Sequence, residues 1–172
     1  MKVLIVSDSH GLEQELKDVF ELHRDADLAF HCGDSQLHGG AECLYPYRVV
    51  KGNCDYGNDF PDELVEETDF GKIFCIHGHR QDVKYDLNTL RYKALERGAD
   101  VVLFGHTHVA GAAVQDGVLF INPGSIRMPR HRPDKTHALL EVKDGRFTVH
   151  FFDTTGEEIN ALYLDGDWPL TK

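Results

Sequence analysis

The sequence lacks the features of two large classes of protein. Its 172 residues include no apolar run near the roughly 20 residues that a membrane-spanning helix needs. It has 18 lysine and arginine residues against 29 aspartate and glutamate residues, and the resulting formal charge of −11 opposes binding to a nucleic-acid backbone. We therefore predict that the chain neither crosses a membrane nor binds duplex nucleic acid.

Paired cysteines are also missing. The four cysteines, Cys32, Cys43, Cys54 and Cys75, are 11, 11 and 21 residues apart, a spacing without a Cys-x-x-Cys pair or a dense disulfide framework. The first apolar segment is followed at once by polar residues 7–10, unlike the apolar core of a secretory signal. We expect reduced thiols, buried at every position except Cys54, in a cytoplasmic protein.

The apolar pattern predicts one domain over residues 1–172, with strands and helices alternating early and strands following one another late. Helical spacing predicts helices over 12–23 and 85–97, the second ending at Gly98. This order is typical of a mixed sheet packed on a second sheet with helices outside, and we expect the tail after Gly156 to be peripheral. The expected strands are Lys2–Val6, Leu28–His31, Arg48–Val50, Leu64–Thr68, Lys72–Ile76, Val101–Phe104, Ala110–Val114, Val118–Ile121, Ala138–Val142 and Phe147–Asp153.

Metal-ligand side chains follow directly after several of these strands. Carboxylate and amide oxygens suit hard divalent cations, and imidazole suits borderline ions such as Zn²⁺ and Mn²⁺. Because the carboxyl ends of strands converge on one crevice in an open α/β sheet, side chains distant in sequence can meet there. The side chains at these strand ends are Asp8, His10, Asp34, Asn53, His77, His106 and His108. The sequence therefore predicts a metal site at one edge of the sheet.

Five short blocks at these positions resemble the calcineurin-like metallophosphoesterase superfamily, specifically its small stand-alone bacterial and archaeal phosphodiesterases. They occur in the family's order within residues 8–108, and Asn122-Pro123-Gly124-Ser125 is similar to a further family segment. One block alone would be a turn motif, but five in order at strand ends are specific. The blocks are Asp8-x-His10, Gly33-Asp34, Gly52-Asn53, His77-Gly78-His79 and Gly105-His106-x-His108.

The resemblance implies a four-layer α/β/β/α sandwich of two mixed β-sheets flanked by helices, with a binuclear metal centre. It implies that Asp34 bridges the two ions and that a metal-bridging hydroxide attacks the phosphorus atom. The implied ligands are Asp8, His10 and His108 for one ion, and Asn53, His77 and His106 for the other. We expect a phosphodiesterase or phosphatase that hydrolyses a small-molecule phosphate ester with two divalent ions, Mn²⁺ first, while Fe²⁺, Ni²⁺ and Zn²⁺ stay open.

The catalytic residues expected from the resemblance are Asp34, Asn53 and His79. Many family members carry a histidine after the asparagine, which protonates the leaving group, and this chain has Cys54 there. The general acid is therefore open, and we expect weak activity on poor leaving groups. The next residue, Asp55, is interpreted as either a partner of a metal ligand or a turn residue, and the turn is favoured. Further candidates for phosphate contacts are Ser9, Arg127 and Arg130.

Five further histidines, which are His23, His38, His131, His137 and His150, are interpreted as surface or hydrogen-bonded residues. Two alternative functions accompany the hydrolase prediction. One branch of the same fold is a protein-binding scaffold with a degraded metal site, whereas this chain keeps a ligand-type side chain at all seven positions. Nucleases with the same core have a basic DNA-binding surface, which this acidic chain lacks. The natural substrate and a homo-oligomeric state stay open.

Overall fold

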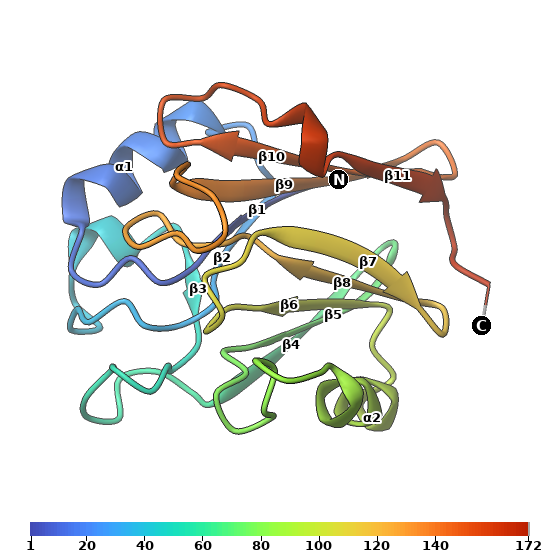
Figure 1. Cartoon of the computed structure of the whole chain (residues 1–172), viewed down its shortest axis with the longest axis horizontal. Coiled ribbons are helices and arrows are strands. Elements are labelled where there is room, and N and C mark those ends of the chain that lie inside the picture. Colours follow the sequence, from blue (N-terminus) through green and yellow to red (C-terminus); the bar gives the residue numbers. More distant parts are fainter. Residues whose placement is uncertain (172) are drawn as a thin grey trace.

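The structure, a computed structural model, describes residues 1–171 and contains two mixed sheets that pack face to face (Figure 1). The six-stranded sheet has the order β11-β10-β9-β1-β2-β3 and the five-stranded sheet the order β4-β5-β6-β8-β7. The first comprises β1 (Lys2–Val6), β2 (Leu28–His31), β3 (Arg48–Val49), β9 (Thr136–Lys143), β10 (Arg146–Asp153) and β11 (Leu164–Asp167). The second comprises β4 (Glu63–Thr68), β5 (Gly71–Ile76), β6 (Val101–Phe104), β7 (Gly111–Gln115) and β8 (Val118–Asn122).

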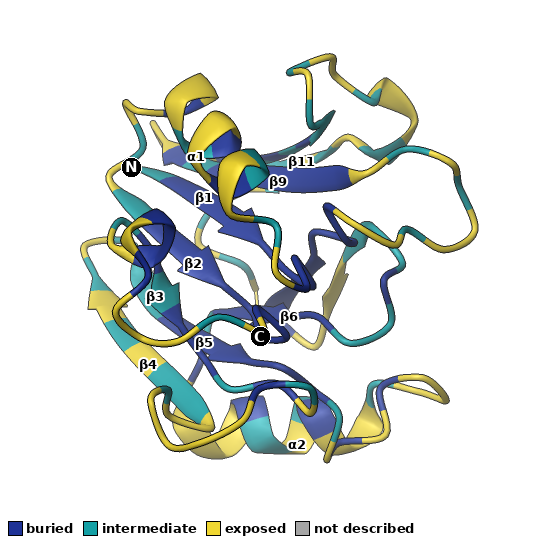
Figure 2. Ribbon diagram, turned by 90° about the vertical axis from the view of Figure 1, so that its left-hand side faces the viewer, coloured by how far each residue is buried: buried dark blue, intermediate teal, exposed yellow. Residues whose placement is uncertain are grey.

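Strand β1 shows why its sequence is a continuous apolar run. Val3 and Ile5 belong to the core between the two sheets, whereas Leu4 and Val6 belong to the core on the other face. Successive side chains of a strand point to opposite faces, so a strand that is covered on both faces needs apolar residues throughout. Figure 2 shows the central strands in the colour of buried residues.

One helix covers the outer face of each sheet. Helix α1 (Glu13–Leu22) packs Leu16 and Val19 against the six-stranded sheet, and α2 (Asn88–Arg97) packs Leu90 and Ala94 against the five-stranded sheet. Short 3₁₀ turns occur at Glu42–Leu44 and Asn160–Leu162. The predicted four-layer α/β/β/α sandwich of two mixed sheets is confirmed.

The expected start of the second helix at Tyr85 is wrong by three residues. Turns occupy residues 79–85, and the carboxylate of Asp86 accepts a hydrogen bond from the backbone N–H of Asn88. A side-chain acceptor for a first-turn N–H favours a helix start there. The helix ends at Gly98, as predicted.

The tail after Gly156 is not peripheral, contrary to expectation. Strand β11 pairs with β10 at the edge of the six-stranded sheet, and Trp168 packs against Phe70 and Phe147. The guanidinium of Arg146 pairs with the carboxylates of Asp165 and Asp167 across the strand pair. These contacts hold a polar strand that has no apolar alternation of its own.

Parallel pairing brings the polar loops together at one edge of the sandwich. Strands β1, β2 and β3 pair in parallel, as do β5, β6 and β8. The backbone N–H of Asp8 donates to the carbonyl of Gly33, and that of Gly105 donates to the carbonyl of His77. The loops after β1 and β2, and those after β5 and β6, are therefore tied in register at the carboxyl ends of their strands.

Candidate metal centre

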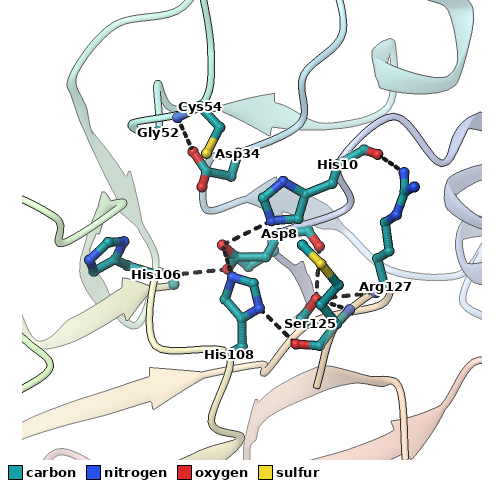
Figure 3. Close-up of polar contacts among 12 residues, drawn as sticks. Asp8, His10, Asp34, Gly52, Cys54, His106, His108, Ser125 and Arg127 are labelled. Atoms are coloured by element: carbon teal, nitrogen blue, oxygen red, sulfur yellow. Dashed lines mark hydrogen bonds and ion pairs between the residues drawn. The ribbon is translucent and has the colours of Figure 1, made fainter. Parts of the chain in front are cut away.

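The first group of the site consists of Asp8, His10 and His108, whose ligand-type atoms lie within 4.8 Å of one another. The Asp8 Oδ1 atom is 3.0 Å from His108 Nε2 and 3.9 Å from His10 Nε2. Figure 3 shows both imidazole rings directed toward the Asp8 carboxylate. Asp8 is fully buried, so these atoms converge at a point inside the molecule.

Asp34 connects this group to a second one. Asp8, Asp34 and His77 form one close set within 4.8 Å, and His10, Asp34 and Cys54 form another. The Asp34 Oδ2 atom is 3.4 Å from His77 Nε2, and Asn53 Oδ1 is 3.2 Å from the same nitrogen. The structure therefore brings together six of the seven predicted ligands, with Asp34 in the middle.

The protonation pattern of the rings tests whether these residues fit a metal ion. The Nδ1 atoms of His77 and His108 lie 2.7 Å from the carbonyls of Cys32 and Met128, and a carbonyl only accepts, so both Nδ1 atoms carry hydrogen. In the neutral rings, Nε2 then directs a lone pair at a carboxylate or amide oxygen. Two acceptors facing each other require a cation between them, and this arrangement is typical of metal-binding histidines.

Orphaned polar atoms point to the same conclusion. Asp8 Oδ1 and His10 Nε2 are buried and have no hydrogen-bond donor. A buried polar atom without a partner costs about 1–3 kcal/mol, more if it is charged. A divalent cation ligated by these atoms removes that cost, so the donor set of carboxylate oxygens and imidazole nitrogens fits a metal ion.

The electrostatics of the site are those of carboxylates compensated by imidazoles. Burial opposes the charge of Asp8, but when His108 is protonated its hydrogen bond to Asp8, together with the charges of His77 and His108, holds the pKa of Asp8 below the ordinary value. The pKa of Asp34 is also lowered despite burial, through the hydrogen bond from His77. Burial likewise opposes protonation of His77 and His108, yet their carboxylate partners raise both pKa values. A metal ion that binds here therefore displaces protons from imidazole.

His106 is the predicted ligand that the structure leaves outside the close groups. Its backbone N–H donates to Asp8 Oδ2 at 3.1 Å (Figure 3). Its ring packs 5.1 Å from that of His77. Burial, followed by the charge of His77, lowers the pKa of His106 to about 4, so the ring is neutral near pH 7. The ring of His79 is 5.4 Å from that of His77, and its Nδ1 atom is buried without a partner.

Backbone geometry explains how short side chains reach this point. Five site residues lie in the left-handed region, with φ of 53° at Asp8, 44° at His10, 56° at Asp34, 66° at His106 and 59° at His108. Non-glycine residues adopt this region at a cost of roughly 1–3 kcal/mol each, and such strain clusters at functional sites. Turning the chain sharply at a strand end directs these side chains back over the sheet edge.

Two glycines allow the loops to approach the ligands closely. A Cβ atom at position 52 would lie 2.0 Å from Asp34 Oδ1, and one at position 105 would lie 2.0 Å from Ser7 Oγ and 2.8 Å from Asp8 Oδ2. Any side chain at Gly52 or Gly105 would therefore displace a carboxylate of the site.

Asp55 holds two of the loops together, so its interpretation as a turn residue is wrong. Its Oδ2 atom accepts hydrogen bonds from the backbone N–H groups of Asp34 and Gly52, both at 2.8 Å. Its Oδ1 atom accepts from the Gln36 N–H at 2.7 Å and the Ser35 hydroxyl at 3.1 Å. The buried carboxylate fixes the position of Asp34 relative to the loop that carries Asn53.

The sequence interpretation also missed His31, a buried histidine at the end of β2. Its Nδ1 atom accepts from the Gly33 N–H at 3.2 Å, so Nε2 carries the hydrogen and donates to Ser9 Oγ at 2.8 Å. Burial lowers the pKa of His31 to about 4, which keeps it neutral. Ser9 itself is fully buried, so its hydroxyl is already engaged inside the loop. The only signal in the sequence was its position beside the Gly33-Asp34 block.

The other residues considered in the sequence analysis lie outside the close groups or contact them through the backbone. Arg127 Nη1 contacts the carbonyl of His10, while the side chain of Arg130 is exposed. The backbone N–H of Cys54 donates to Asp34 Oδ1 at 2.7 Å. His23 and His137 form a buried pair with 2.8 Å between their Nε2 atoms, and His150 pairs with Glu158.

Comparisons with known proteins agree with this geometry. Residues 1–145 match the family model described as the calcineurin-like phosphoesterase superfamily domain. YsnB, a probable metallophosphoesterase of Bacillus subtilis strain 168, is 49% identical over 163 residues, covering 94% of this chain and 96% of the relative.

Solved structures share the fold. A protein of Streptococcus pneumoniae TIGR4, described as a predicted phosphoesterase, has a TM-score of 0.92 at 34% identity, covering 96% of this chain and 97% of that one. Vps29 of Entamoeba histolytica, in a complex with Zn²⁺, has a TM-score of 0.77 at 22% identity, covering 97% and 99%, which shows a likeness of fold alone. In the described residues 1–171, no helix is long and apolar enough to cross a membrane.

Proposed function

The chain belongs to the calcineurin-like phosphoesterase superfamily, and on that premise we propose that it is a phosphodiesterase that uses two divalent metal ions. One observation carries the proposal: the buried Asp8 Oδ1 and His10 Nε2 atoms have no donor, although Asp8 Oδ1 lies 3.0 Å from His108 Nε2. These atoms together form a cation site. The substrate is a small phosphate ester.

The contacts support the following ligand roles. Asp8, His10 and His108 would hold one ion, and Asn53 and His77 would hold the other, with His106 beside it. Asp34 belongs to close groups with residues of both sets and would bridge the two ions. Two divalent ions, when bound, activate water and neutralise charge at the phosphoryl group.

The chain's own groups position the ester. A water oxygen forms a bond to phosphorus, one P–O ester bond breaks, and the alcohol leaves with a proton. His79 is kept neutral because burial and the charge of His77 lower its pKa, and its half-buried ring beside His77 is the group that contacts a phosphoryl or leaving oxygen. Asp55 holds Asp34 and the Asn53 loop in place for this step.

Two finer assignments complete the proposal. Mn²⁺ is the first candidate for the metal, with Fe²⁺, Ni²⁺ and Zn²⁺ as alternatives, because a mixed oxygen and nitrogen donor set accepts all four. A cytoplasmic location is supported by four free cysteines, three of them buried.

A scaffold is the competing function on this fold. The likeness to Vps29 supports the fold but no shared partner, because identity is 22%. The convergence of Asp8, Asp34 and His77 within 4.8 Å favours a retained metal site over a degraded one.

The test is metal content and hydrolysis in the Asp34→Asn variant. We expect well below two metals per chain by elemental analysis and a loss of bis(4-nitrophenyl) phosphate hydrolysis of about 100-fold or more, because the bridging charge is removed. Asp69→Asn is the matched control, since Asp69 is an exposed carboxylate in the β4–β5 turn. An unchanged metal content in Asp34→Asn would contradict the bridging role, and no hydrolysis by the unaltered chain with any of the four metals would favour the scaffold.

A further inference from the structure

A hollow of about 550 Å³ lies on the outer face of the five-stranded sheet, and we call it the sheet hollow. Its walls are Val83 and Leu87 from the segment before α2, Phe104 of β6, Phe120 of β8 and Ala113 of β7. Cavities of roughly 300–1,000 Å³ with mainly apolar walls and a few polar groups are typical of small-molecule sites. The sheet hollow has the size and lining of such a site.

The register of β7 and β8 explains the depression. Ala113 pairs with Phe120 and Gly111 pairs with Asn122, so small residues on the edge strand stand beside large ones. Helix α2 packs Leu90 and Ala94 against the same face of the sheet. Because the side chains of β7 are small, they do not fill the space between α2 and the loop that carries Arg130, and this space is the hollow.

The sheet hollow adjoins the loop that carries two proposed metal ligands. Thr107 lines it and stands between His106 and His108 in the chain. Asn122 at the end of β8 donates to Thr107 Oγ1 at 3.0 Å and to the Gly105 carbonyl at 2.9 Å. The backbone N–H of Arg130 donates to the His108 carbonyl at 3.0 Å. One loop thus forms the edge of both the metal centre and the hollow.

Basic side chains stand at the rim of the sheet hollow, although the protein as a whole is acidic. Lys84, Arg130 and His131 line the sheet hollow and are exposed. Within residues 1–171, neither Lys84 nor Arg130 forms an ion pair with a carboxylate.

We propose that the sheet hollow binds the organic arm of the phosphate ester, an aromatic or other apolar group that carries a second negative charge. The apolar walls accept the body of the arm, and Lys84 and Arg130 pair with its charge. Because the hollow shares the His106–His108 loop with the metal centre, the phosphoryl group of the same molecule reaches the ligands. This assignment rests on the proposed hydrolase function and narrows its substrate class.

The first test measures binding without hydrolysis. The metal-free, ¹⁵N-labelled chain is titrated with 1-naphthyl phosphate, and inorganic phosphate serves as the control probe. We expect saturable amide shifts at Val83, Thr107, Val109 and Ala113 with naphthyl phosphate but not with phosphate alone. Shifts confined to other surfaces, or equal shifts with both probes, would overturn the assignment.

The second test fills the hollow. In Ala113→Trp the indole occupies the space of the arm, whereas Gln115→Trp places the same side chain on the same face of β7 outside the lining. We expect the KM for bis(4-nitrophenyl) phosphate to rise about tenfold in Ala113→Trp, with unchanged metal content and little change in kcat. The Gln115→Trp variant should keep the KM of the unaltered chain. Equal KM values in both variants would overturn the assignment.

The charge at the rim is tested with Lys84→Glu against Lys135→Glu, an exposed lysine outside the hollow. We expect weaker binding of 4-carboxyphenyl phosphate, whose organic arm carries the second negative charge, only in the first variant. If no ester is hydrolysed but the shifts still map to the hollow, the hydrolase function fails and the binding site stands. If the same amide signals shift with protein concentration alone, a second copy of the chain occupies the hollow and the small-molecule assignment is wrong.

Discussion

Two buried pairs of histidines in this molecule have opposite electrostatics. His77 and His108 face the carboxylates of Asp34 and Asp8, and these partners raise their pKa values despite burial. His23 and His137 face each other, and burial lowers the pKa of both, that of His137 to about 3. At similar depth, the imidazoles of His77 and His108 thus compensate carboxylate charge, whereas those of His23 and His137 are neutral.

The difference shows that the partner of a buried imidazole, more than its burial, decides its role. A carboxylate opposite Nε2 creates a place for a cation, either a proton or a metal ion. A second imidazole opposite Nε2 supplies only a neutral hydrogen bond. Eleven histidines in a sequence therefore do not predict a metal site until their partners are known.

Matched substitutions in the two pairs test this distinction most strongly. We expect His108→Gln to lose metal and to lower phosphodiester hydrolysis by at least about 100-fold, because a proposed metal ligand beside Asp8 is removed. His137→Gln should keep full metal content and activity while lowering the free energy of unfolding by about 1–3 kcal/mol. Elemental analysis and denaturant unfolding measure both. Loss of metal in His137→Gln would break the comparison.

The carboxylate of Asp55 lies near the candidate metal centre but accepts hydrogen bonds from backbone N–H groups, whereas Asp8 and Asp34 face imidazole rings. In Asp55→Asn, one oxygen becomes an NH₂ group that faces N–H donors, so we expect the free energy of unfolding to fall by about 2 kcal/mol. The matched control is Asp59→Asn, which alters an exposed carboxylate that accepts from the Gly39 N–H. Denaturant unfolding measures both variants. Equal effects would show that the Asp55 contacts do not hold the loops.

The histidine pair predicts a stability loss in acid. The unfolded chain protonates His137 near its ordinary pKa of 6.5, whereas the folded chain does so only near 3, with Asp153 favouring the charge and His23 opposing it. The unfolded state therefore binds more protons in this window, so stability is complete above pH 6.5 and falls as pH drops toward 3. At pH 5.5 the loss is about 1.4 kcal/mol.

Thermal or denaturant unfolding of the metal-free chain between pH 7.5 and 5.5 checks this slope. In His137→Gln the contribution of that residue should vanish, and the slope should become shallower by the same amount. An unaltered slope in the variant would assign the acid sensitivity to other groups.

The smallest effect concerns Cys54, which occupies the position where many family members carry a histidine. Burial and the Asp34 hydrogen bond raise the pKa of Cys54 to about 11, so it is an uncharged thiol near pH 7. We expect rates on aryl phosphodiesters to fall steeply as the leaving-group pKa rises, and Cys54→His to flatten that dependence. For 4-nitrophenolate the change should be less than about threefold. A flat dependence in the unaltered chain would indicate another acid.

Much of the fold was predictable because its signals are local. Strands β1, β2 and β6 have the predicted bounds, since each is an apolar run bordered by polar turn residues. Strand β11 was not predictable, because Leu-Asp-Gly-Asp has no apolar alternation. It forms through pairing with β10, and its ion pairs with Arg146 join residues about 20 positions apart in the chain.

The site shows the same division between local and long-range information. Glycine-flanked ligands after strands were visible in the sequence, and the structure brings Asp8, His10, Asp34, His77 and His108 together. Asp55 and His31 were missed because their importance lies in contacts with other loops. A lone aspartate after Asn-Cys is compatible with a turn until the backbone of residues 34–36 is seen to donate to it.

At the proposed ligands with left-handed backbone, a substitution can remove the side chain with or without relieving the unfavourable backbone conformation. At His106, with φ of 66°, alanine would delete the imidazole and keep the unfavourable conformation. Glycine would delete the same imidazole and relieve the conformation, by roughly 1 kcal/mol. The folded chain thus tolerates an unfavourable backbone conformation so that its proposed ligands face inward. The His106→Gly variant would therefore unfold at a higher temperature than the His106→Ala variant.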